Sequence, residues 1–178
     1  MATTILRENA AMYATRDESK IREMLESMHR AHRDRDAGAI TAPYAPDAEV
    51  FNLAPPLTHH GKDRQETQSW LDTWATPIEI SARDLEITVT GDFAFAHGFL
   101  HMHGTKKGAE HAVDFWMRET LCFERRRGAW QIVHEHTSVP FYMDASTRPA
   151  FDLKPESLHA ESRRDEIADI TGLVTRTV

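Results

Sequence analysis

Four segments in the second half of the chain alternate apolar and polar residues with a period of two. Leu85, Ile87 and Val89 mark the first segment. The turns between the segments fall at Gly91-Asp92, at Gly104 to Gly108 and at Arg125 to Gly128. Because successive side chains of a strand point to opposite faces, the pattern predicts four consecutive antiparallel strands joined by short turns, a meander.

Helical spacing precedes this alternation. Apolar residues from Ile21 to Ala31 recur every three or four positions, which predicts a first helix that begins near Thr15 and ends near Arg35. Asp63, with Glu66 three residues later, is typical of the start of another helix. Helices followed by a meander predict an α+β fold, with the helices over one concave face of a twisted sheet.

Length and composition limit the classes of protein that need consideration. The 178 residues suffice for one domain, and the net charge of −7 is spread rather than concentrated in blocks, which disfavours nucleic acid as a partner. Cys122 is the single cysteine, so we expect no disulfide framework and a reducing, cytoplasmic setting. No apolar run approaches the length of a membrane span, so no membrane partner is expected.

The last alternating segment, residues 128–141, is the most informative part of the chain. One face of the predicted strand begins with Trp130 and Ile132 and continues with His134, His136 and Ser138. An apolar floor that becomes polar toward one end is typical of the wall of a ligand pocket. Pro140 ends the strand because it has no N–H to donate.

Pairing this strand with its neighbours predicts a row of three polar side chains. A tight turn at Arg125–Gly128 would place Arg118 opposite His136 and Thr120 opposite His134, on the face of Trp130, with His97 near Arg118. In such a row Arg118 would hold a carboxylate or enolate oxygen, and His136 or His134 would transfer a proton. The alternative is a buried polar network whose members only satisfy one another.

The histidines also permit a metal site. His101 and His103 form one His-x-His pair, and His134 and His136 form another. Each pair lies on one face of a strand and would suit zinc or iron. However, a third strand separates the two pairs, so one ion could collect four ligands only if the sheet bent strongly. We therefore assign no metal and no cofactor, and keep a histidine-ligated metal protein as an alternative.

Four segments resemble a known family. The segments GAWQIVHEHTSVPF, DFWMRETLCF, VFNLAPPLTHHG and FDLKP are similar to those of the SnoaL-like, ketosteroid isomerase-related families of the nuclear transport factor 2-like superfamily. The resemblance extends from about Asp17 to Pro155. It implies a cone-shaped domain over residues 16–141. Residues 1–15 have no clean period and would form an N-terminal arm or a short helix, and loosely periodic apolar residues after Met143 predict a C-terminal extension (142–178) with a helix. Because this scaffold hosts many activities, the resemblance indicates the fold more strongly than the chemistry.

The resemblance also implies positions around a ligand. Asn52 stands near the place where ketosteroid isomerases carry the aspartate that moves the proton; an amide is no base, so Asn52 would instead donate a hydrogen bond. The strand pairing described above places Thr120 and His97 on the same wall, where Trp116 would help to position the ligand. Trp74 belongs to an aromatic stripe at helical spacing that is typical of a core, and in this scaffold its ring could also roof the pocket.

Together these features predict a cofactor-independent isomerase, cyclase or hydratase that acts by proton transfer on a small, apolar carbonyl compound. The alternative is a non-catalytic ligand-binding or association module. In either case the second apolar face of the sheet predicts a homodimer packed sheet to sheet.

Overall fold

Three helices and two short strand segments precede a long meander in residues 2–155, the part of the chain that the computed structural model describes. The elements in chain order are α1 (Ala2–Asp34), α2 (Ala37–Thr41), β1 (Tyr44–Phe51), β2 (His59–His60), α3 (Arg64–Leu71), β3 (Glu79–Thr90), β4 (Phe93–Gly104), β5 (Val113–Arg126) and β6 (Ala129–Ser138). The predicted α+β class is confirmed, as are the four strands of the meander.

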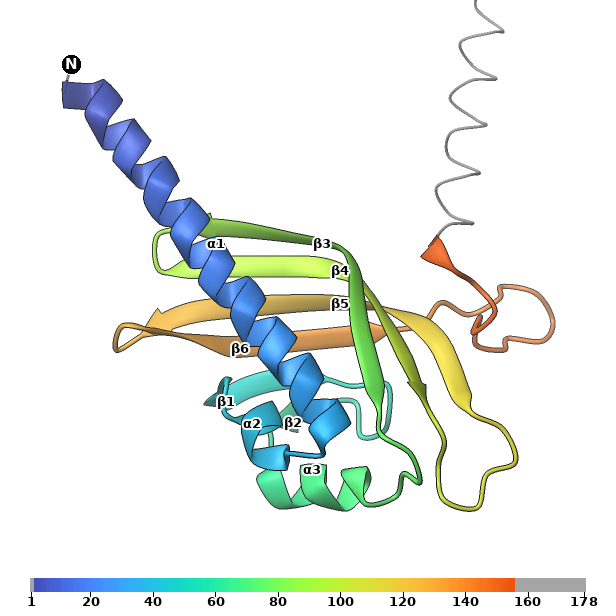
Figure 1. The fold of residues 1–178 in the computed structure, drawn as a ribbon. Coiled ribbons are helices and arrows are strands. Elements are labelled where there is room, and N and C mark those ends of the chain that lie inside the picture. Colours follow the sequence, from blue (N-terminus) through green and yellow to red (C-terminus); the bar gives the residue numbers. More distant parts are fainter. Residues whose placement is uncertain (1, 156–178) are drawn as a thin grey trace, which may run out of the picture.

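The strands form one curved, open sheet in the order β2-β1-β6-β5-β4-β3. Strands β3 to β6 pair antiparallel as predicted, whereas β1 joins β6 in parallel. Helix α1 crosses one face of this sheet, and α2 and α3 lie near the C-terminal end of α1 (Figure 1). We call the face under α1 the concave face and the other the outer face.

Helix α1 packs on the concave face through residues at helical spacing. Ile21, Leu25 and Met28 are buried in the same core cluster as Leu121 and Ile132 of the sheet. The helix begins at Ala2, so the predicted start near Thr15 is wrong and residues 2–15 continue the same helix. The helix predicted within residues 142–178 falls on residues beyond 155, outside the described range.

A second hydrophobic cluster packs α2 and α3 against the C-terminal part of α1. Trp74 is 1% exposed and packs with Ile40, Leu71 and Ile78. Asp63 caps α3 by accepting a hydrogen bond from the Glu66 N–H at 2.8 Å, which confirms the predicted helix start. These contacts fix the loop between β1 and α3, which supplies one of the side chains described below.

The sheet bends at a β-bulge in β3, in the part of that strand that pairs with β4. The register of β3 shifts between Arg83 and Glu86, and Asp84 has a φ of 52°. A Cβ at Gly98, which faces this bulge, would lie 3.1 Å from the Arg83 carbonyl oxygen and from the Leu85 Cα. The absence of a side chain at Gly98 therefore allows the backbone of β3 to come close and the sheet to curve toward α1.

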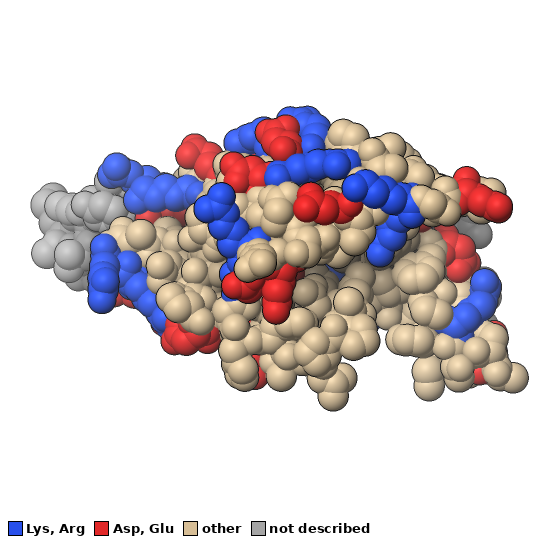
Figure 2. Space-filling view, turned by 90° about the horizontal axis from the view of Figure 1, so that it is seen from below, with Lys and Arg blue, Asp and Glu red and all other residues tan. Residues whose placement is uncertain are grey.

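No helix within residues 2–155 is both long and apolar enough to cross a membrane. On the face shown in Figure 2, acidic and basic side chains are interspersed rather than separated by sign.

We expect Gly98→Ala to destabilise the fold by about 1–3 kcal/mol, because the added methyl meets backbone atoms that cannot move aside independently. Chemical denaturation measures the change. Thr88→Ala on the exposed side of β3 is the control and should change the free energy of unfolding by less than about 1 kcal/mol. Equal effects of the two substitutions would contradict the role given to Gly98.

Candidate functional site

The hairpin of β5 and β6 decides which side chains face the helices. Its turn has two residues, Arg127 and Gly128, with φ of 52° and 83°, so Arg125 pairs with Trp130. The register then shifts: Cys122 pairs with His134, whereas the next residue of β5, Phe123, pairs with Ile132. Val133 is thus an extra residue in β6, a β-bulge, and it reverses the faces of the residues that follow.

The predicted row Arg118–His136–His97 consequently lies on the outer face. Arg118 pairs with Ser138 rather than with His136, Thr120 pairs with both His136 and His97, and the buried residues of β5 are the odd-numbered ones. Arg118, Thr120, His97 and His136 are exposed and His134 is half-buried. The prediction that they share the face of Trp130 is wrong. Their catalytic and ligand-binding roles stay predictions, now for the outer face.

The other predicted ligand residues are also dispersed. Trp116 stacks on His101 on the outer face, with ring centroids 4.9 Å apart. Trp74 is enclosed in the second core cluster, and Asn52 is exposed in the loop after β1. The structure therefore does not bring these three side chains together.

The two His-x-His pairs remain apart, on β4 and β6 with β5 between them. Among the side chains that the structure describes, those of residues 14–155, no group of three or more His, Cys, Asp or Glu is arranged to hold a metal ion. Instead, His101 pairs with Asp114 at 2.6 Å, while the rings of His134 and His136 are T-shaped to the Phe51 ring at centroid distances of 5.0 and 5.7 Å.

A different polar cluster occupies the concave face, and we call it the interior cluster: Tyr44, Lys62, Glu119 and Glu135, with His32 above them on α1. Glu135 is 5% exposed. Its Oε2 accepts hydrogen bonds from the Tyr44 hydroxyl at 2.5 Å and from Lys62 Nζ at 2.7 Å. Burial raises the pKa of Glu135, but the Lys62 ammonium and these two hydrogen bonds outweigh burial and hold that pKa below its ordinary value.

Glu119 has the opposite environment. It lies diagonally across from Glu135, because Leu121 pairs with Glu135 and Glu119 with Thr137. Its side chain is buried, and among the described side chains of residues 14–155 its carboxyl group has no hydrogen-bond partner. Burial, reinforced by the charge of Glu135 and only partly offset by Lys62, raises the pKa of Glu119 to about 8. Near pH 7 the cluster thus combines one ionised and one protonated carboxyl group.

Helix α1 adds two imidazoles. Nδ1 of His32 lies 2.8 Å from the Met28 carbonyl oxygen, which can only accept, so Nδ1 carries the proton. Burial lowers the pKa of His32 to about 4, and burial with the neighbouring His32 and Arg30 lowers that of His29 to about 4. Both rings are therefore neutral at pH 7. His32 lies close enough to Lys62 and Glu135 for their charges to affect its pKa.

The sequence reasoning missed every member of the interior cluster. Glu119 and Glu135 occupy odd-numbered positions of β5 and β6, which the alternation predicts to lie opposite the face of Trp130, on the side expected to pack against a second copy. Lys62 follows Gly61, whose φ of 70° and N–H bond to the Ala48 carbonyl turn the loop back toward β1. Gly61, directly before Lys62, is a sequence signal for a turn that could bring the lysine back toward β1. The bulge at Val133 has no such signal in the sequence.

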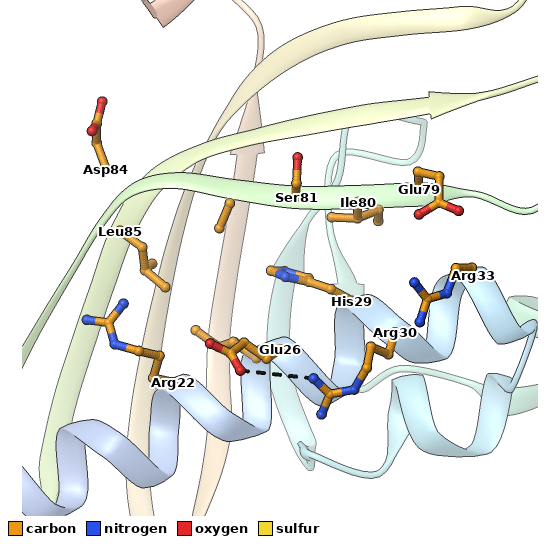
Figure 3. A pocket seen from close by; sticks show the side chains of 12 residues that line it. Arg22, Glu26, His29, Arg30, Arg33, Glu79, Ile80, Ser81, Asp84 and Leu85 are labelled. Atoms are coloured by element: carbon orange, nitrogen blue, oxygen red, sulfur yellow. Dashed lines mark ion pairs between the residues drawn. The ribbon is translucent and has the colours of Figure 1, made fainter.

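The described part of the chain also contains a groove of about 470 Å³ between α1 and β3 (Figure 3). His29 lies along it, one helical turn from His32. No member of the interior cluster lines this groove.

Comparison with known proteins agrees with this architecture. Residues 21–142 match the family model of the SnoaL-like domain. A nuclear transport factor 2-like protein of unknown function from Pseudomonas putida is 33% identical, with a TM-score of 0.71 over 80% of this chain and 99% of the other.

Two more distant structures show the same fold. One is a nuclear transport factor 2-like protein with a cystatin-like fold from Novosphingobium aromaticivorans (19% identity, TM-score 0.61, 79% and 92% covered). The other is a superfamily protein from Salmonella enterica (15%, 0.62, 73% and 95%). No curated protein matches the chain.

The raised pKa of Glu119 predicts that stability falls as pH rises toward 8. Between its ordinary pKa of 4.5 and about 8, the folded chain binds more protons here than the unfolded chain, so the free energy of unfolding decreases as pH rises. His29 and His32 act with the opposite sign, but only between about 4 and 6.5. From pH 6.5 to 8 the wild type should lose stability by up to about 1.4 kcal/mol per pH unit.

Glu119→Gln should remove this fall, and urea denaturation at both ends of the pH range measures it. Glu23→Gln, a change at an exposed carboxylate on α1, should keep the wild-type dependence. The same slope in wild type and Glu119→Gln would refute the protonated state of Glu119.

Proposed function

The chain belongs to the family of SnoaL-like domains, and from this membership and the interior cluster we propose that it transfers a proton within a small, apolar carbonyl compound. One observation carries the proposal: two buried carboxyl groups share the concave face, and Tyr44 and Lys62 donate hydrogen bonds to Glu135 but not to Glu119. Carboxyl groups that differ in protonation can act as acid and base in one reaction.

In the proposed reaction, protonated Glu119 donates a hydrogen bond to the carbonyl oxygen of the substrate and stabilises the enolate. Glu135 takes a proton from the carbon next to the carbonyl through Oε1, since Lys62 and Tyr44 engage Oε2. Return of this proton to another carbon completes an isomerisation, and the enzyme is regenerated. Diagonal neighbours on adjacent strands lie about 7–8 Å apart at the Cα atoms, a span that suits groups acting on an oxygen and on a nearby carbon.

The alternative is a binding module without turnover, in which the interior cluster only satisfies its own polar groups. The pairing of Lys62 with Glu135 is compatible with that alternative. Glu119 fits that alternative less well, because a largely buried carboxyl group without a side-chain hydrogen bond costs free energy. Such unfavourable burial is more typical of functional sites than of structural networks.

We further propose a homodimer through the outer face of the sheet. Phe93 and Phe95 are 41% and 37% exposed there, and Phe95 stacks on His97 with ring centroids 6.0 Å apart. Trp116 and His101 stack on each other farther along the same face. Exposed aromatic residues gathered on one sheet face favour burial against a second copy. In such a dimer Arg118, Thr120 and His136 would lie at or near the interface rather than in a pocket.

Hydrogen–deuterium exchange of 2-tetralone, an apolar ketone with acidic α-hydrogens, tests the proposed chemistry. We expect the wild type to accelerate exchange in D2O, and Glu119→Gln to reduce the acceleration at least about 100-fold because it removes the acid. Arg118→Ala is the matched control: it is the adjacent residue on the opposite face and should leave the rate within about twofold.

The outcomes separate the competing sites. Loss of exchange in Arg118→Ala with normal exchange in Glu119→Gln would move the site to the outer face. A wild type that does not accelerate exchange would favour the binding module.

Sedimentation velocity tests the dimer. We expect a dimeric wild type and a monomeric Phe95→Asp variant, because a carboxylate at the centre of the interface would lose its water without a partner. Leu57→Asp, at a loop position that is 94% exposed, should remain dimeric. A monomeric wild type would contradict the proposal.

A further inference from the structure

The groove between α1 and β3 is separate from the interior cluster and has the size of a small-molecule site. Its volume of about 470 Å³ falls within the range of about 300–1,000 Å³ typical of ligand pockets. Leu25 of α1 and Ile80, Ala82 and Leu85 of β3 give it an apolar wall on both sides. In Figure 3, Leu85 points into the groove, whereas the side chains of Ser81 and Asp84 point away from α1.

Two arginines line one end of the groove. Arg30 and Arg33, three residues apart on α1, lie at the same end (Figure 3). Their ion pairs are long, 4.0 Å from Arg30 to Glu26 and 3.6 Å from Arg33 to Asp34, compared with about 2.7–2.9 Å for a strong charge-assisted hydrogen bond. Glu79 at this end is exposed and would compete for the guanidinium groups. Two guanidinium groups with such weak partners suit a carboxylate ligand.

His29 lies between this end and the apolar wall. Its Nε2 is buried and has no hydrogen-bond partner within the described residues. A buried ring nitrogen without a partner is unfavourable, and a hydroxyl group can satisfy it whichever tautomer is present. The side chain points from α1 toward β3, across the groove (Figure 3).

We propose that this groove binds a small amphiphilic carboxylate: an apolar or aromatic body against Leu25, Ala82 and Leu85, a carboxylate at Arg30 and Arg33, and a hydroxyl group at His29. The site is distinct from the interior cluster, so its occupant need not be the substrate of the proposed reaction. An organic acid bound here would contact both α1 and β3, the two elements that enclose the concave face on this side.

Isothermal titration calorimetry with 6-hydroxynaphthalene-2-carboxylate tests the site, with the corresponding carboxamide as the uncharged probe. We expect the carboxylate to bind the wild type at least about tenfold more tightly than the carboxamide. The double change Arg30→Ala and Arg33→Ala should remove this preference. Arg16→Ala, at an exposed position of the same helix outside the groove, is the control and should retain it.

Two further variants locate the body and the hydroxyl group. Ala82 is an exposed residue of the apolar wall, so Ala82→Phe should fill the groove and abolish binding of both probes. His29→Phe should weaken the hydroxylated probe but leave naphthalene-2-carboxylate within about twofold. Absence of binding to the wild type, equal affinity for carboxylate and carboxamide, or unchanged binding by Ala82→Phe would each overturn the proposal. Glu119→Gln should bind normally, so failure of the proposed proton transfer would leave this result unaffected.

Discussion

The register between β5 and β6 is the constraint on which the arrangement of polar groups depends. A two-residue turn sets Arg125 against Trp130, and the bulge at Val133 then exchanges the faces of the rest of β6. Without the bulge, His134 and His136 would lie under α1, and Glu135 would point outward. One additional residue therefore determines whether the interior of the domain contains imidazoles or carboxylates.

Burial of Glu135 in turn constrains the loop between β1 and α3. An ionised carboxylate under a helix requires a compensating charge, and Lys62 provides it at 2.7 Å. Lys62 reaches this position because Gly61 adopts a positive φ and lies close to β1. Only glycine fits there, since a Cβ would lie 2.8 Å from the Pro46 carbonyl oxygen. Asp63 then starts α3 directly after the lysine. Three consecutive residues, 61–63, thus set the turn of the loop, the charge partner of Glu135 and the start of α3.

The two faces of the sheet serve different purposes in this interpretation. The concave face carries the core and the two carboxyl groups, while the outer face carries aromatic rings, histidines and Arg118. Helix α1 has two faces as well, since His32 lies over the interior cluster and His29 lines the groove beside β3. Because one rigid helix carries both rings, an occupant of the groove would contact the element that also covers the cluster.

The sequence by itself determined the class of fold, the meander, the start of α3 and the resemblance to the SnoaL-like family. These depend on period-two and helical spacing, on capping residues and on turn residues, all of which act over a few positions. Only the tertiary structure decided the face of each polar side chain in the last hairpin. A bulge is a property of two paired strands and has no period of its own, so alternation alone placed His136 inside and Glu135 outside. The meeting of Lys62, Tyr44, Glu119 and Glu135 likewise depends on the parallel pairing of β1 with β6 and on the path of a loop, which are long-range contacts that local residue patterns do not encode.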